Sequence, residues 1–177
     1  MSQDFQTDNK FCIVGIDPAI VNVGWSVFTK KENSTFCFVK GGVFSASEKE
    51  DLATRYNSLR NDFVKIIKKY KADFVVFEDV DFRNTISRKT QAYLFGSLAV
   101  FLSVLPPSVG YILISKYRVN KILSIEKGKS KEGVQKRYAG LIKRVSLPKS
   151  KIEHFADSIA LVEAFLIENN YGTIEPA

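Results

Sequence analysis

The stretch GIDPAIVNVGW, residues 15–25, places a carboxylate, Asp17, at the end of the apolar run FCIVGI. This run has the length and the Val/Ile content of a buried strand, and Pro18 predicts a turn directly after it. A carboxylate that emerges where a buried strand ends is a common component of metal-dependent phosphoryl-transfer sites. The sequence around Asp17 therefore predicts both a central strand and a candidate metal ligand.

Further acidic positions lie far along the chain. Glu78 ends a second apolar run, DFVVF, and Asp157 lies in the stretch KIEHFADSIALVEAFL three residues after His154. Because residues three apart lie on one face of a helix, His154 and Asp157 can reach the same ion. Oxygen-rich ligand sets select Mg²⁺ or Mn²⁺ over zinc. Two such ions would activate a water molecule and stabilise the leaving 3′ oxygen of a phosphodiester.

Each of these signals has a structural alternative. A DP dipeptide often only opens a turn, and an acid in an HxxD pair can be a helix cap or part of a surface salt bridge. Glu78 is harder to explain in that way, because the carboxyl ends of parallel strands are where α/β folds bind ligands. If the strand register is shifted by one residue, Asp79 or Asp81 is the ligand instead.

Length and composition predict a single domain of 177 residues, with a core over about residues 11–168 and short flexible termini. No apolar run reaches the roughly 20 residues that span a membrane. The N-terminal stretch MSQDFQTDNK lacks the pattern of a signal peptide, so we expect an intracellular, non-secreted protein. Cys12 and Cys37 have no CxxC spacing, and neither zinc nor a disulfide is expected.

The formal net charge of +7 favours a polyanionic partner. The excess is concentrated between residues 116 and 151, a segment that contains twelve Lys or Arg residues and only two Glu. A solvated basic surface is the alternative, but a basic segment next to a predicted acidic site favours nucleic acid. The candidate DNA-binding residues are Lys116, Arg118, Lys121, Lys127, Lys129, Lys131, Lys136 and Arg137.

The hydrophobic pattern predicts an α/β fold with a five-stranded mixed sheet flanked by helices on both faces. The expected strands are residues 11–17, 23–29, 35–39, 74–77 and 109–114. The first three form an antiparallel meander, and a helix at 52–70 brings the fourth back parallel to the first. A further helix, 87–105, is apolar all round, so it is either buried centrally or covered by a second copy of the chain. The last helix is expected to begin at the capping box SKIE.

These motifs together resemble the RuvC-like Holliday junction resolvases, a branch of the RNase H-like superfamily. The resemblance is carried by GIDPAIVNVGWSVF (residues 15–28), VVFEDVDF (75–82) and HFADSIAL (154–161), and the element order agrees over about residues 11–167. Ala19, where bacterial members have glycine, and the lysine-rich segment look more like the poxvirus branch.

The resemblance implies a homodimer that cuts four-way DNA junctions by paired symmetric nicks in DNA recombination and repair. It implies two Mg²⁺ ions per site, with Mn²⁺ able to substitute, held by Asp17, Glu78, His154 and Asp157. Family lysines that meet the scissile phosphate point to Lys121 and Lys131, with Lys116 and Lys129 as neighbouring alternatives. The family's dimer contact would fall on residues 93–105. Aromatic residues that help to open the junction would be Phe82 and Tyr117.

Other functions use the same features. Another RNase H-like nuclease, such as one that cuts RNA–DNA hybrids, needs the same carboxylates but no dimer. Residues 17–24 faintly resemble the phosphate loop of actin-like ATPases, which usually need two such domains. A non-catalytic DNA-binding module would tolerate replacement of Asp17 or Glu78. No small-molecule cofactor or membrane partner is expected. In the poxvirus branch, the protein would process viral replication concatemers in the host cytoplasm.

Overall fold

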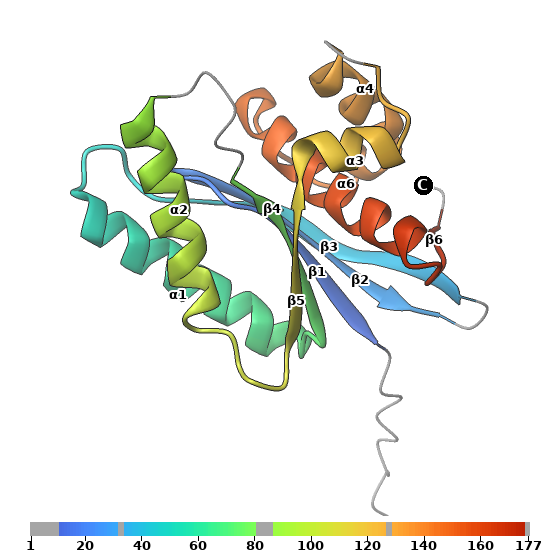
Figure 1. Ribbon diagram of the computed structural model, residues 1–177, viewed down its shortest axis with the longest axis horizontal. Coiled ribbons are helices and arrows are strands. Elements are labelled where there is room, and N and C mark those ends of the chain that lie inside the picture. Colours follow the sequence, from blue (N-terminus) through green and yellow to red (C-terminus); the bar gives the residue numbers. More distant parts are fainter. Residues whose placement is uncertain (1–10, 32–33, 81–86, 127–128, 176–177) are drawn as a thin grey trace, which may run out of the picture.

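The computed structural model describes residues 11–31, 34–80, 87–126 and 129–175, and its centre is a mixed six-stranded sheet (Figure 1). The strand order is β5-β4-β1-β2-β3-β6. The bounds are β1 Cys12–Asp17, β2 Asn22–Lys30, β3 Thr35–Ser45, β4 Phe74–Asp79, β5 Gly110–Ser115 and β6 Thr173–Ile174. Strands β1, β2 and β3 form the predicted antiparallel meander, and β4 is parallel to β1, as predicted.

The prediction of five strands was wrong by one. Strand β6 is two residues long and pairs parallel to the edge strand β3, opposite Thr35 and Phe36. A pairing so short leaves no run of alternating or apolar residues in the sequence, so pattern analysis could not detect it. Near this edge the half-buried Cys37 lies 2.7 Å from a carboxylate oxygen of Glu175, and both cysteines are free.

Helices cover both faces of the sheet, as the sequence predicts (Figure 1). One face carries α1 (Leu52–Tyr70) and α2 (Arg88–Leu102). The other carries α3 (Lys116–Ile122), α4 (Ser130–Arg137), α5 (Ala139–Lys143), the short helix η2 (Lys149–Lys151) and α6 (Ile152–Glu168). The capping prediction for the last helix was wrong, because α6 continues from η2 without a side-chain cap.

Two hydrophobic cores lie on opposite faces of the central strands. Successive side chains of a strand point to opposite faces, so Ile13 of β1 packs in the core under α6, whereas Val14 and Ile16 pack in the core under α1 and α2. Every residue of β1 is buried. A doubly covered strand explains why its sequence is continuously apolar up to Asp17.

The most deeply buried helix is α6, which buries eleven residues, and not the apolar helix α2. Helix α2 buries Ser97, Leu98 and Phe101 toward the core, while Phe95 is 50% exposed. Of the two possibilities predicted for this helix, central burial is therefore excluded. Among the helices that the structure describes, none is long and apolar enough to cross a membrane.

Candidate active site

Asp17 and Glu78 lie on adjacent strands at the carboxyl edge of the sheet. Ile16 of β1 pairs with Phe77 of β4, so the two acids are the next residues on parallel neighbours. Asp17 is 8% exposed. Side chains alternate along β4, so Glu78 and Asp79 point to opposite faces. The carboxylate of Glu78 interacts electrostatically with Asp17 and Asp157, which favours Glu78 as the site residue over Asp79.

Two glycines of the sheet bring α6 against these acids. A Cβ atom at Gly24, the residue opposite Asp17 in the β1–β2 pairing, would lie 1.9 Å from the carbonyl oxygen of His154. A Cβ atom at Gly15 would lie 2.1 Å from the carbonyl oxygen of Ser158. Because both positions lack a side chain, the backbone of α6 touches the strands directly, and its first two turns reach the carboxyl edge.

Three of the four predicted ligands, Asp17, His154 and Asp157, make close side-chain contacts in this structure. Nδ1 of His154 lies 2.7 Å from Oδ2 of Asp17, and Nζ of Lys116 lies 2.7 Å from Oδ2 of Asp157. Asp157 is 7% exposed, so its carboxylate depends on these neighbours for neutralisation. Lys116 begins α3 directly after β5, whose last residue pairs with Asp79 of β4. All of these side chains therefore meet at one end of the central strands.

The crowding of carboxylates shifts their protonation equilibria. Burial raises the pKa of Glu78 well above its usual range, and the charge of Asp17 raises it further. Burial also raises the pKa of Asp157 to about 6, although the Lys116 ammonium opposes this shift. The hydrogen bond to Asp17 raises the pKa of His154. For Lys116, burial lowers the pKa, but Asp157 and Glu78 more than compensate and the net shift is upward.

The donor set fits a hard divalent cation. Within residues 11–31, 34–80, 87–126 and 129–175, no three His, Cys, Asp or Glu side chains are grouped closely enough to hold an ion together, and Nζ of Lys116 lies against Asp157. Three carboxylates and one imidazole nevertheless converge there, and oxygen-rich donors suit Mg²⁺ or Mn²⁺. Burial removes the carboxylates of Glu78 and Asp157 from water, and the charge of a bound cation would compensate for this lost solvation.

The predicted phosphate-contacting lysines lie close to this edge or on the helix that leads from it. Nζ of Lys131 is 2.9 Å from Oε1 of Glu153, the residue before His154. Lys121 is exposed in the last turn of α3. Lys116, which the sequence suggested as a DNA-binding residue and as an alternative for contact with the scissile phosphate, lies among the carboxylates. Its position directly after a parallel strand was the signal that could have identified it as a site residue.

Three of the other predicted DNA-binding residues form ion pairs. Arg118 pairs with Glu168 at 2.7 Å, Arg137 with Glu163 at 2.6 Å and Lys129 with Glu126 at 3.0 Å. Lys136 is exposed on α4. Lys127 falls outside the described residues, as do the alternative ligand Asp81 and the aromatic candidate Phe82. The second aromatic candidate, Tyr117, is 68% exposed beside Lys116.

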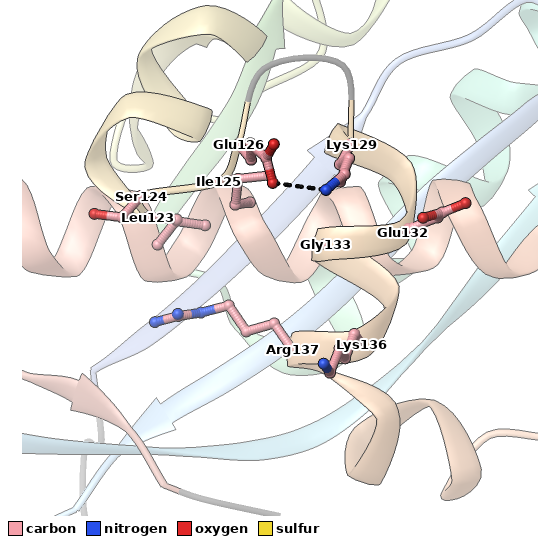
Figure 2. A pocket seen from close by; sticks show the side chains of 9 residues that line it. All are labelled: Leu123, Ser124, Ile125, Glu126, Lys129, Glu132, Gly133, Lys136 and Arg137. Carbon is pink, nitrogen blue, oxygen red and sulfur yellow. Dashed lines mark hydrogen bonds and ion pairs between the residues drawn. The ribbon is translucent and has the colours of Figure 1, made fainter.

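A cavity of about 440 Å³, lined by charged residues of both signs, lies where α3 leads into α4 (Figure 2). Gly133 provides part of the space, because a Cβ atom there would lie 2.9 Å from Cγ2 of Ile125. Figure 2 shows Lys136 and Arg137 at the C-terminal end of α4, and the Glu126–Lys129 ion pair at the opposite end of the cavity. The lining residues are Leu123, Ser124, Ile125, Glu126, Lys129, Glu132, Gly133, Lys136 and Arg137.

Comparison with known proteins gives a consistent assignment. The family model described as "Crossover junction endodeoxyribonuclease RuvC" matches residues 13–165. A protein of that name from Rhizobium johnstonii is 25% identical over 165 residues, which cover 93% of this chain and 94% of that protein.

Two solved structures show the same fold. The RuvC protein of Thermus thermophilus in complex with a Holliday junction substrate superimposes with a TM-score of 0.70 at 19% identity, over 94% of this chain and 99% of that one. The Fowlpox virus resolvase in complex with Holliday junction DNA gives a TM-score of 0.57 at 12% identity, over 90% and 99%. At these identities, the likeness establishes the fold.

Proposed function

Because the chain belongs to the RuvC family of crossover junction endodeoxyribonucleases, we propose that it is an endonuclease that resolves four-way DNA junctions. The observation that carries this proposal is the convergence of Asp17, Glu78 and Asp157 at one sheet edge, from β1, β4 and α6. A single domain spanning the described residues suffices for one such site. Hydrolysis of a phosphodiester at this edge requires no protein nucleophile.

We further propose that Asp17, Glu78, His154 and Asp157 hold two divalent cations, Mg²⁺ or in its place Mn²⁺. When bound, these ions supply an activated water and neutralise charge on the leaving oxygen. The protein contributes the positioning. His154 fixes the orientation of the Asp17 carboxylate through Nδ1, and the burial of Asp157 limits the access of bulk water. Lys121 and Lys131 are proposed to contact the scissile phosphate.

The proposed DNA surface is formed by the exposed lysines of α3 and α4, Lys121, Lys131 and Lys136, of which Lys136 lines the cavity of Figure 2. Positive charge on this surface would neutralise phosphates and release counter-ions, so binding should depend strongly on salt. Contacts to the backbone read the shape of a junction more than its bases. We propose that a homodimer supplies the second active site for symmetric cuts, and that the half-exposed side of α2 around Phe95 forms its interface.

The placement in the poxvirus branch stays a prediction. Ala19 and the lysine-rich segment support it, whereas the relative matched by sequence above is bacterial and the bacterial structure has the higher TM-score. A role in processing viral concatemers, and a place in the host cytoplasm, would follow from that placement alone.

The test is cleavage of an end-labelled four-way junction, a linear duplex and an RNA–DNA hybrid, with Mg²⁺, Mn²⁺ or chelator. Wild type should make paired symmetric nicks in the junction. Asp17→Asn and Glu78→Gln should lower the cleavage rate at least about a hundredfold. Loss of a metal ligand should cost more activity than loss of a residue that only orients a ligand. Both variants should still bind the junction.

Asp79→Asn is the matched control, because Asp79 is the next residue on the same strand and faces the other way. It should cut normally. Full activity of Asp17→Asn would end the proposal, and loss of activity in Asp79→Asn but not in Glu78→Gln would move the ligand by one residue. Cutting of the hybrid alone would assign a different nuclease activity, and binding without cutting would indicate a DNA-binding module.

A further inference from the structure

The ammonium group of Lys116 lies inside the proposed active site. Its Nζ atom is 2.7 Å from Oδ2 of Asp157, and the two side chains are 35% and 9% exposed. Ion pairs elsewhere on the basic segment are more open to solvent. The lysine side chains of the Lys129–Glu126 and Lys131–Glu153 pairs are 63% and 70% exposed. The Lys116–Asp157 pair is therefore better shielded from water than these two pairs. The attraction within an ion pair is stronger where water is excluded.

The backbone around Lys116 is fixed by its place in the fold. It is the first residue of α3, and the side chain of Ser115 caps this helix by accepting a hydrogen bond from the amide of Arg118. One turn on, Val119 is 4% exposed in the core under α6. Ser115, the residue before Lys116, pairs with Asp79 at the end of β4. A lysine at this position extends its ammonium along the edge where the strands present Asp17 and Glu78.

We propose that Lys116 is a resident counter-cation of the carboxylate cluster, which a divalent ion must displace from Asp157. This inference rests on the proposed function, because it takes Asp157 as a metal ligand. In the structure, the Oδ2 atom of Asp157 is already used by Nζ of Lys116. A dication bound to the same carboxylate would repel an ammonium group only a few ångströms away, so both cannot occupy this position.

Competition of this kind has two measurable consequences. A ligand that must displace an existing partner binds with an apparent affinity lowered by the strength of that partner. Lys116 therefore weakens the binding of the divalent ion. Lys116 also neutralises crowded carboxylates when no metal is present, so it stabilises the metal-free fold. Removal of its charge should make metal binding tighter and the metal-free protein less stable.

The experiment is a titration of the protein with Mn²⁺ alone, without DNA, in which free Mn²⁺ is measured by electron paramagnetic resonance. Lys116→Met removes the charge and the donor, and Lys116→Gln removes the charge but keeps a hydrogen-bond donor. Both should bind Mn²⁺ about tenfold more tightly than wild type, the size expected when one charged hydrogen bond no longer has to be broken.

Lys65→Met is the matched control. Lys65 also forms an ion pair of 2.7 Å, with Asp62, but its side chain is 75% exposed on α1. Its replacement should leave Mn²⁺ affinity unchanged. In thermal unfolding, metal-free Lys116→Met should melt below wild type, and Mn²⁺ should raise its melting temperature more than that of wild type.

The outcomes separate this inference from the proposed function. Wild type that binds Mn²⁺, with unchanged or weaker binding in Lys116→Met and Lys116→Gln, would overturn the displacement of Lys116 and leave the metal site in place. Absence of Mn²⁺ binding in wild type and in both variants would overturn the metal site and this inference together. If Lys116→Met does not fold, the comparison of Lys116→Gln with wild type decides the result in the same way.

Discussion

The Nδ1 atom of His154 lies 2.7 Å from the Oδ2 atom of Asp17, although the two residues are 137 positions apart in the chain. The contact joins the first turn of α6 to the last residue of β1. The hydrogen bond raises the pKa of His154, so the imidazole carries positive charge over a wider pH range than a free histidine. Like Lys116, His154 thus compensates carboxylate charge in the metal-free protein.

His154→Asp should make the fold depend more on divalent ions. The change replaces a hydrogen-bond partner of Asp17 with a second carboxylate, and like charges at this distance repel. We expect a loss of about 1 kcal/mol without metal, which is roughly 2–4 °C in melting temperature for a chain of this size. Mg²⁺ should restore more stability to His154→Asp than to wild type. The measurement is thermal unfolding in chelator and in Mg²⁺.

The control for that change is His154→Asn, which removes the imidazole without adding charge. It should be affected less by chelator than His154→Asp. Equal melting temperatures of His154→Asp and wild type in chelator would show that residue 154 does not face Asp17.

The metal-free protein should become less stable as the pH rises from about 4 to values above about 6.5. In the folded state the pKa of Asp157 is raised by burial to about 6, and that of His154 is raised by its hydrogen bond to Asp17. The unfolded groups titrate near about 4 and about 6.5, so the folded state binds more protons between these values and the folded pKa values. Stability therefore falls with increasing pH.

Asp157 and His154 each contribute to the stability of the fold, and these contributions are lost over different pH ranges. That of Asp157 is fully present below about pH 4 and is lost as the pH rises through about 6, whereas that of His154 is fully present below about 6.5 and is lost above it. Urea unfolding in chelator at several pH values measures the slope. Asp157→Asn should flatten the lower part by an amount on the order of 1 to 3 kcal/mol. Parallel curves for Asp157→Asn and wild type would contradict the shifted pKa of Asp157.

The central sheet and its acids could be predicted because each rests on a local signal. A continuous apolar run marks a doubly covered strand, and an acid at its end marks the carboxyl edge. Asp17 and Glu78 were found in this way, and the structure places them on adjacent strands. Strand β6 gave no such signal, because two residues of pairing depend on where the chain returns after α6 and not on their own composition.

The pairing of side chains at the site could not be predicted, because it depends on how helices dock. His154 reaches Asp17 because Gly24 lets α6 approach the sheet, and Lys116 reaches Asp157 because β5 ends level with β4. Neither relation is visible in the spacing of residues along the chain. The sequence therefore identified Lys116 only as a candidate for contact with DNA and, through the family resemblance, as an alternative to Lys121 and Lys131 at the scissile phosphate.

Gly24→Ala should destabilise the protein and disturb the site together. The added methyl group would lie 1.9 Å from the carbonyl oxygen of His154, which is backbone and cannot rotate away. Relief requires a shift of α6 from the sheet, at about 3 kcal/mol, the upper end of the usual overpacking range. Chemical unfolding measures this loss. Gly42→Ala, whose Cβ would be 3.4 Å from its nearest neighbour, should lose little, and similar losses for both variants would contradict the close docking of α6.

Lys136→Ala should mainly weaken DNA binding, whereas Arg137→Met should mainly lower stability. The two cations are adjacent and line the same cavity (Figure 2). Lys136 is exposed, so its loss should reduce the slope of log K against log salt by about 1, the value for one phosphate contact. Arg137 is held 2.6 Å from Glu163, whose side chain is 15% exposed and also meets the hydroxyl of Tyr138. Removal of the guanidinium group leaves that carboxylate without its cation, and we expect a stability loss of about 1 kcal/mol or more with little change in the salt slope.

Salt titrations of junction binding and urea unfolding of both variants measure the two effects. An unchanged slope for Lys136→Ala together with a reduced slope for Arg137→Met would show that the arginine leaves Glu163 to contact DNA, and would reverse the roles of the two residues.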